Sequence, residues 1–260
     1  MSGLWRRIEP RVFITLATSS VENLNVLNVV TADRVVAQIS TEHFPNEHSP
    51  KVTFLGTHFE NLRIARHKTE PQLKLDFVGN RPEGKDGLYP SSRTGLIGAI
   101  EDQYERLKAA FSGLDADCKK SMRVEDEKAW LDKQYYGFSG SNHAAIGDAA
   151  REAKAAVDAG KPGKWDGITC SLVEHIEIED IKIPRRNGEE IKVHPPARSF
   201  GHVIHIPEFG TIFLAELKVN HNSFHLTMIR LELGCIADGS ASLVTCSVNG
   251  GGSKGGGTGT

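Results

Sequence analysis

Four histidines lie within one apolar segment, FGHVIHIPEFGTIFLAELKVNHNSFHLTMIRLELG (residues 200–234). Imidazole nitrogens are among the commonest protein ligands of zinc and other transition metals, so this segment could hold a metal site. Glu208 and Glu216 could supply carboxylates if folding brings these strands together. The histidines in question are His202, His205, His221 and His225.

The spacing of these histidines argues against one shared ion. His202 and His205 are three residues apart, and positions i and i+3 of a flat strand face opposite sides of a sheet. They could bind one ion only across a bulge. His221 and His225 are four apart, but the letters NHNS between them favour a turn rather than a helix that would align them. We therefore expect histidines on strand faces and in turns, and keep a metal-dependent site as the alternative.

Other catalytic signatures are incomplete. A nucleophile elbow needs G-x-S-x-G, and around Ser139 the last glycine is replaced by Ser141. Asn142 is better explained as a helix cap. The GGGSKGGG stretch is not expected to be a phosphate loop, because Lys254 follows Ser253 rather than a glycine and no helix follows. The sequence therefore predicts no catalytic residues and no cofactor.

Composition excludes several kinds of partner. The chain has 260 residues and a formal net charge of −2, with 39% hydrophobic and 25% charged residues. No basic block stands out, so binding to a nucleic-acid backbone is not expected. No apolar run approaches the roughly 20 residues of a membrane-spanning helix, and we expect no membrane span.

The predicted location follows from the N-terminus and the cysteines. The apolar run at 12–17 is shorter than the core of a secretory signal, roughly 7–15 residues. Cys118, Cys170, Cys235 and Cys246 form no C-x-x-C pair, which favours buried thiols, although a Cys235–Cys246 bridge stays possible in an oxidising compartment. We expect a cytoplasmic protein, or one released without a cleaved signal, with a surface location left open.

The elements that would position these residues fall into four regions. Alternating apolar and polar residues predict N-terminal β repeats over 1–80 and a C-terminal β region over 165–248 that completes the same sandwich. A helical insertion with flanking loops occupies 81–164, and a Gly-rich tail occupies 249–260.

The insertion contains three predicted helices. One carries apolar residues at spacings of three and four and ends at Gly113. The second runs through VEDEKAWLDKQY (124–135), and the third, rich in alanine, lies between Asn142 and Gly160. The apolar stripe of the first helix consists of Ile97, Ile100, Tyr104, Leu107 and Phe111.

An internal repeat is the most informative pattern. Residues 19–39 align without a gap on residues 57–77, at an offset of 38, and a shorter third copy begins at LVEHIEI. A two-stranded unit cannot bury its apolar face alone, so repeated hairpins must pack on one another. The residues that define the repeat are Glu22, Asn23 and Leu24, Glu60, Asn61 and Leu62, and Glu174 and Ile176.

The strand TIFLAELKV (211–219) is apolar on both faces at its start, which predicts a strand covered on two sides. Strict alternation would place Phe213, Ala215, Leu217 and Val219 on one face. The predicted fold is therefore mainly β (α+β), an antiparallel β-sandwich of repeated hairpin units with an inserted helical segment.

The motifs TSSVENLNVLNVVTADRVVA, FENLRIARH and GTIFLAELKV…FHLTMIRLEL…ADGSASLVTCSVNGG are similar to repetitive β-domains of bacterial surface and uncharacterised proteins, of the choice-of-anchor type. The resemblance covers the two β regions and not the insertion. It implies a structural or adhesive role without catalytic residues.

The function expected from the sequence is that of a non-catalytic structural protein. Its β scaffold would form a homo-oligomer or bind a protein partner. The alternatives are a metal-dependent enzyme using the histidines of residues 200–234, and a ligand-binding β module of the carbohydrate type. Aromatic candidates for the latter are Trp5, Trp130 and Trp165.

Overall fold

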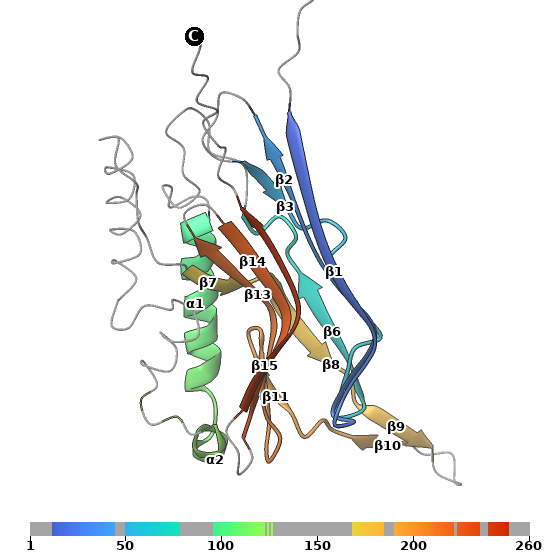
Figure 1. Cartoon of the computed structure of the whole chain (residues 1–260). Helices are drawn as coiled ribbons and strands as arrows, with labels where there is room; N and C mark the ends of the chain where they lie inside the picture. The colour runs from blue at the N-terminus through green and yellow to red at the C-terminus, as the bar shows by residue number, and fades with distance from the viewer. Residues whose placement is uncertain are drawn as a thin grey trace, which may run out of the picture.

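A computed structural model confirms the predicted fold class: the residues that it describes form two open antiparallel β-sheets and a separate two-stranded ribbon, with two short helices between the β regions (Figure 1). The structure describes residues 12–44, 50–78, 96–122, 124, 126, 168–184, 190–220, 223–234 and 239–249. Of the described helices, neither has the length and apolar character needed to cross a membrane.

The first sheet has the strand order β1-β2-β5-β6-β8, and the short strands β3 and β4 also pair with β2. Its N-terminal strands β1 and β2 are long and form one hairpin, with a ladder from Phe13↔His43 to Val26↔Val30 that skips only Asn23 and Asp33. The strands are β1 Phe13–Val26, β2 Val30–His43, β3 Lys51–Thr53, β4 His58–Glu60, β5 Arg63–Ile64, β6 His67–Leu73 and β8 Val173–Ile178.

The second sheet has the order β11-β12-β13-β14-β15. One edge of β13 is shared, because β12 pairs with its first half and β7 with its second half. A separate ribbon joins β9 Ile181–Pro184 to β10 Glu190–Val193. The strands of the second sheet are β7 Ile168–Ser171, β11 Arg198–Phe200, β12 Val203–Ile206, β13 Gly210–Asn220, β14 Ser223–Leu233 and β15 Gly239–Asn249.

The molecule has three layers, with the second sheet in the middle (Figure 1). Its inner face packs on the first sheet, where β15 contacts β1 and β2 and β14 contacts β2. Helix α1 (Leu96–Ser112) covers the other face, and Phe111 of α1 meets Phe200 of β11 edge to face at 5.8 Å. Gln103 of α1 hydrogen-bonds the backbone of Ser171 in β7.

The first predicted helix is confirmed. Ile100, Tyr104, Leu107 and Phe111 are all buried, as their spacing predicts for a helix lying on a sheet. A short helix, α2 (Ala116–Ser121), follows, and the Asp115 side chain caps it by accepting a hydrogen bond from the Cys118 amide. The third helix predicted for the insertion lies outside the described residues. So does the second, except for Val124 and Asp126, which are described and are not helical.

The two segments that flank β2, β1 on one side and β4 with β5 on the other, each contain a left-handed residue at which the chain changes face. Asn23 (φ 54°) in β1 and Asn61 (φ 49°) between β4 and β5 lie on either side of Asp33 of β2. Asn61 Nδ2 donates a hydrogen bond to Asp33 Oδ2 at 2.6 Å. Asparagine tolerates this conformation better than most residues. The core-facing side chains therefore step by three residues here, from Val21 to Leu24.

The same geometry recurs 38 residues apart in the two hairpin turns. Leu27 and Asn28 have φ of 52° and 57°, and Ala65 and Arg66 have φ of 50° and 72°. Positive φ at both central residues is typical of type I′ turns. In β8, the third copy, the register shifts opposite Gln72 and Leu73 of β6, so a bulge there replaces the left-handed residue.

The second sheet contains an equivalent arrangement, in which two left-handed residues lie on either side of one strand. Ala215 of β13 (φ 47°) and Val244 of β15 (φ 56°) lie on either side of Met228 of β14. The two-sided burial predicted for β13 is confirmed, since Ile212 to Leu217 are all buried. The predicted strict alternation through Ala215 is wrong: Phe213 and Glu216, three residues apart, both contact Arg230.

Candidate functional site

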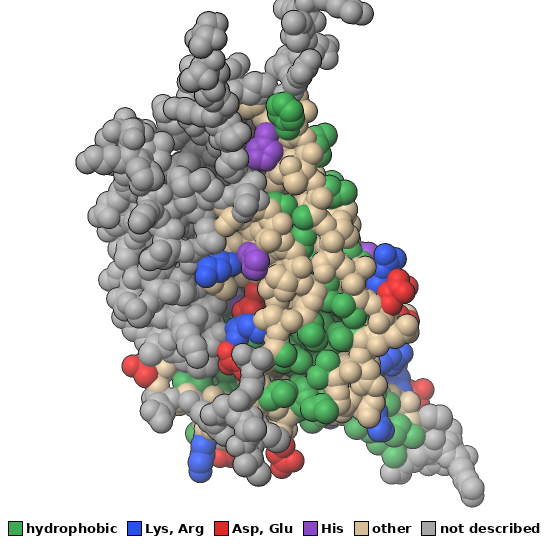
Figure 2. Space-filling view, viewed as in Figure 1, with side chains coloured by type: hydrophobic (Ala, Val, Ile, Leu, Met, Phe, Trp, Pro, Cys, Tyr) green, Lys and Arg blue, Asp and Glu red, His purple; other side chains and the backbone are tan. Residues whose placement is uncertain are grey.

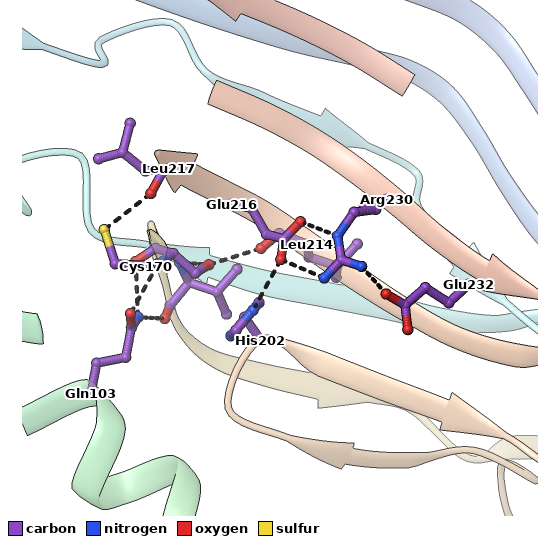
Figure 3. A network of polar contacts seen from close by, with 10 residues as sticks. Gln103, Cys170, His202, Leu214, Glu216, Leu217, Arg230 and Glu232 are labelled. Atoms are coloured by element: carbon purple, nitrogen blue, oxygen red, sulfur yellow. Dashed lines mark hydrogen bonds and ion pairs between the residues drawn. The ribbon is translucent and has the colours of Figure 1, made fainter. Parts of the chain in front are cut away.

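An ionic cluster lies on the helix-side face of the second sheet, formed by the buried Glu216 and His202 and the half-buried Arg230 and Glu232 (Figure 3). We call these four residues the Glu216 cluster. Arg230 donates two hydrogen bonds to Glu216, from Nε to Oε2 at 2.6 Å and from Nη2 to Oε1 at 2.9 Å. Its Nη1 also donates to Glu232 Oε1. His202 Nε2 lies 3.8 Å from Glu216 Oε1.

The backbone kink at Ala215 makes this cluster possible. Arg230 lies opposite Phe213 in the ladder, and its guanidinium stacks on the Phe213 ring with its central carbon 3.6 Å from the ring centroid. Without the kink, Glu216 would point away from Phe213 and Arg230. The left-handed Ala215 places Glu216 on the same side of the sheet as Phe213 and Arg230. There two N–H groups of the guanidinium donate to the two carboxylate oxygens of Glu216.

The electrostatics of the cluster favour the ionised pair. Burial raises the pKa of Glu216, but the hydrogen bonds and positive charge of Arg230, with a smaller effect of His202, outweigh it and hold that pKa below its usual value. Burial lowers the pKa of Arg230, but the hydrogen bonds and negative charges of Glu216 and Glu232 outweigh burial. The pKa of Arg230 is therefore raised above its usual value. The Glu216 side chain is only 7% exposed, so its charge depends on Arg230.

A hollow of about 290 Å³ opens beside the cluster. It offers ammonium, imidazole, guanidinium, carboxylate and hydroxyl groups on one face of β7, β13 and β14, which suits hydrogen bonding to a small polar molecule. It is lined by Thr169, Glu216, Lys218, His225, Thr227, Arg230 and Glu232.

The structure separates the candidate metal ligands. His202 lies beside Glu216, whereas the His205 Nδ1 is 3.2 Å from the Thr211 hydroxyl, and burial lowers the pKa of His205. His225 lines the hollow and Glu208 is exposed in the turn between β12 and β13. Among the described residues no three His, Cys, Asp or Glu side chains are grouped to hold an ion. His221 lies outside those residues.

Other candidates named from the sequence are only partly described. Cys118, Cys170 and Cys246 are buried free thiols, and Cys235 lies outside the described residues. Cys170 is fully buried in β7, where its Sγ lies 3.3 Å from the Leu217 carbonyl oxygen, and burial raises its pKa (Figure 3). The serine at 139 and the three tryptophans lie outside the described residues as well.

A second candidate site is the side of the sandwich where both sheets end. β1 is the terminal strand of the first sheet and β15 that of the second, and the two strands contact each other. Residues 13–21 of β1 and all eleven residues of β15 are uncharged. Three apolar side chains of β1 are largely exposed: Phe13 (64%), Ile14 (68%) and Leu16 (59%).

The opposite ends of both sheets carry charges. β8, which ends the first sheet, contains Glu174, His175 and Glu177, and β11, which ends the second, contains Arg198. In Figure 2 a largely apolar or uncharged surface lies over β1 and β15, and charged side chains lie to either side of it. Charged residues on an edge strand usually prevent pairing with another chain. Residues 13–21 of β1 and all of β15 lack this protection.

Fold and site together define a layered β protein with an ionic cluster in its middle sheet and with two edge strands that are uncharged over residues 13–21 of β1 and throughout β15. A family model described as a domain of unknown function (DUF8256) matches residues 2–220, and the chain belongs to that family. No curated protein and no solved structure matches the chain. The resemblance to choice-of-anchor β-domains therefore stays a prediction.

Proposed function

We propose that this protein is a non-catalytic structural protein whose β scaffold self-associates through its uncharged edge strands. The observation that carries the proposal is the combination, in β1, of a nine-residue uncharged edge with exposed Phe13, Ile14 and Leu16. Among the described residues, β1 pairs only with β2, so the backbone groups of its other edge have no ladder partner.

Edge strands are normally shielded by lysine, proline, inward charges or bulges, because unpaired backbone groups recruit other strands. β1 has none of these between Phe13 and Val21, and its left-handed residue comes later, at Asn23. Pairing with another chain would satisfy the free backbone groups and cover the exposed apolar side chains together. Those gains support an interface at this strand.

The test is the molar mass of the purified full chain over a hundredfold range of concentration, by sedimentation velocity and light scattering. We expect a concentration-dependent oligomer. Leu16→Lys places a charge on the edge and should raise the dissociation constant at least tenfold, about 1.4 kcal/mol. Leu55→Lys is the matched control, since Leu55 is equally apolar and exposed but lies in the loop before β4. A monomer at every concentration would refute the proposal.

The hollow beside the Glu216 cluster supports a second candidate function, a binding module for small polar ligands such as sugars. Thr169, Thr227 and the charged groups around them present donors and acceptors on one face. Calorimetric titration with a panel of neutral and acidic monosaccharides tests it. Binding that Thr227→Val abolishes supports this function, and no heat with any sugar at millimolar concentration counts against it.

A further inference from the structure

We propose that β1 pairs with β1 of a second copy of this chain, antiparallel, about a two-fold axis that passes through Ala17. The partner is thus the same strand, and the first sheet becomes continuous across two protomers. This inference rests on the proposed self-association and specifies its contact.

β1 suits the contact better than β15, although residues 13–21 of β1 and all of β15 are uncharged. The ladder of β1 runs without interruption from Phe13 to Glu22 opposite β2. In β15 the left-handed Val244 lies in the middle of the strand and breaks the flat edge. The apolar side chains of β15, including Val244, Cys246 and Val248, are already buried, whereas those at the start of β1 are exposed. Pairing therefore covers more apolar surface at β1.

Symmetry restricts the register. Two identical strands that pair antiparallel in one sheet are related by an axis perpendicular to the sheet, and each residue faces a partner residue on the same side. Because neighbouring residues of a strand point to opposite faces, the two-fold axis must pass through a residue and not between two residues. With the axis at Ala17, Phe13 lies opposite Val21, and all nine paired residues are uncharged. Moving the axis to Leu16 shortens the paired segment within β1 to seven residues, and moving it to Thr18 brings Glu22 and the kinked Asn23 into it.

This register also matches the side chains on both faces. On the core-facing side the exposed Phe13 packs against Val21 of the second copy, an aromatic and β-branched pair of the kind that stabilises sheets. On the outer side Leu16 lies opposite Thr18, and the two copies of Leu16 are diagonal neighbours across the axis. Ile14 and Leu16 from both strands then form one apolar cluster.

Disulfide trapping in the full chain tests the register. Only the residue on the axis lies opposite itself, at about 5 Å between Cα atoms, so Ala17→Cys should cross-link to itself under mild oxidation. Thr15→Cys and Ser19→Cys should not cross-link alone, because each would lie about 14 Å from its own copy. Mixed together they should cross-link to each other, because Thr15 faces Ser19. We expect at least a tenfold excess of the Ala17→Cys and mixed products over the Thr15→Cys, Ser19→Cys and Leu55→Cys products.

The outcomes separate this inference from the function it rests on. Oligomers that cross-link at other positions, or not through β1, would overturn the β1 pairing and leave self-association intact. A monomer by mass, with no cross-link in any variant, would overturn both. The wild-type chain under the same oxidation gives the background from its native cysteines. Circular dichroism identifies any variant that fails to fold, and the mixed Thr15→Cys and Ser19→Cys pair then tests the register independently of Ala17→Cys.

Discussion

Removing Arg230 should destabilise the protein severely. Arg230→Met keeps the length of the side chain but leaves the Glu216 carboxylate, 7% exposed, without its two guanidinium hydrogen bonds. Breaking one partner of a buried ion pair costs about 3–5 kcal/mol. Because most single domains are stable by only about 5–15 kcal/mol, this loss is a large part of the total. Loss of the stacking on Phe213 adds a smaller term.

Removing both partners should cost far less. In Glu216→Leu/Arg230→Met the buried charge and its counterion disappear together, and apolar side chains of similar size fill the space. Such replacements are often neutral or stabilising. We therefore expect the double variant within about 1–2 kcal/mol of wild type, and a coupling energy of at least about 2 kcal/mol from the double-mutant cycle.

Urea denaturation followed by circular dichroism measures both quantities, and pH gives an internal check. In Arg230→Met, burial is no longer opposed by Arg230, so the pKa of Glu216 should rise above its usual value of 4.5. A raised folded-state pKa penalises the native state at high pH, so the deficit of Arg230→Met should shrink as pH falls from 7.5 to 5. In the wild-type protein the lowered pKa of Glu216 stabilises the native state instead. That stabilisation is lost only as pH falls below the usual pKa of a glutamate. A deficit below about 1 kcal/mol, or one that grows towards pH 5, would refute this account of the cluster.

Three further outcomes are expected. Phe111→Ala removes the fully buried ring that packs edge to face on β11, and should lower the free energy of unfolding by about 3–5 kcal/mol in urea. Ala215→Val puts a β-branched side chain at φ 47° and should cost at least about 1–2 kcal/mol, whereas Ala215→Gly should leave the thermal midpoint unchanged or higher. Cys170, buried and with a raised pKa, should resist iodoacetamide at pH 8 in the native protein and react once urea unfolds it, as mass spectrometry of its peptide will report.

The sequence predicted the strands and the first helix well because their apolar residues recur at the spacing that burial demands. The face of each long strand was predicted only in part. Strict alternation failed at Ala215, because a single left-handed residue reverses the side on which the following residues lie, and alanine gives little sign of that conformation. The asparagines of the repeat, Asn23 and Asn61, carried a better signal, since asparagine is enriched at positive φ.

The ionic cluster was missed for a related reason. In the sequence alone, Glu216 is a candidate only as a metal ligand, and no motif marks Arg230. Both are charged residues inside otherwise apolar strands, and such residues are rarely buried unless paired. That rule could have suggested a partner for each. It could not have chosen the partner, because the kink at Ala215 decides which side of β13 Glu216 occupies.

The kinks at the centres of the long strands bear on how relatives of this protein can be recognised. Each copy of the repeat carries apolar residues in the order i, i+3, i+5, as in Val21, Leu24 and Val26, and in Val173, Ile176 and Ile178. A search for amphipathic strands with a fixed period of two would dismiss such segments as irregular. One that allows a single three-residue step would recognise all three copies as strands.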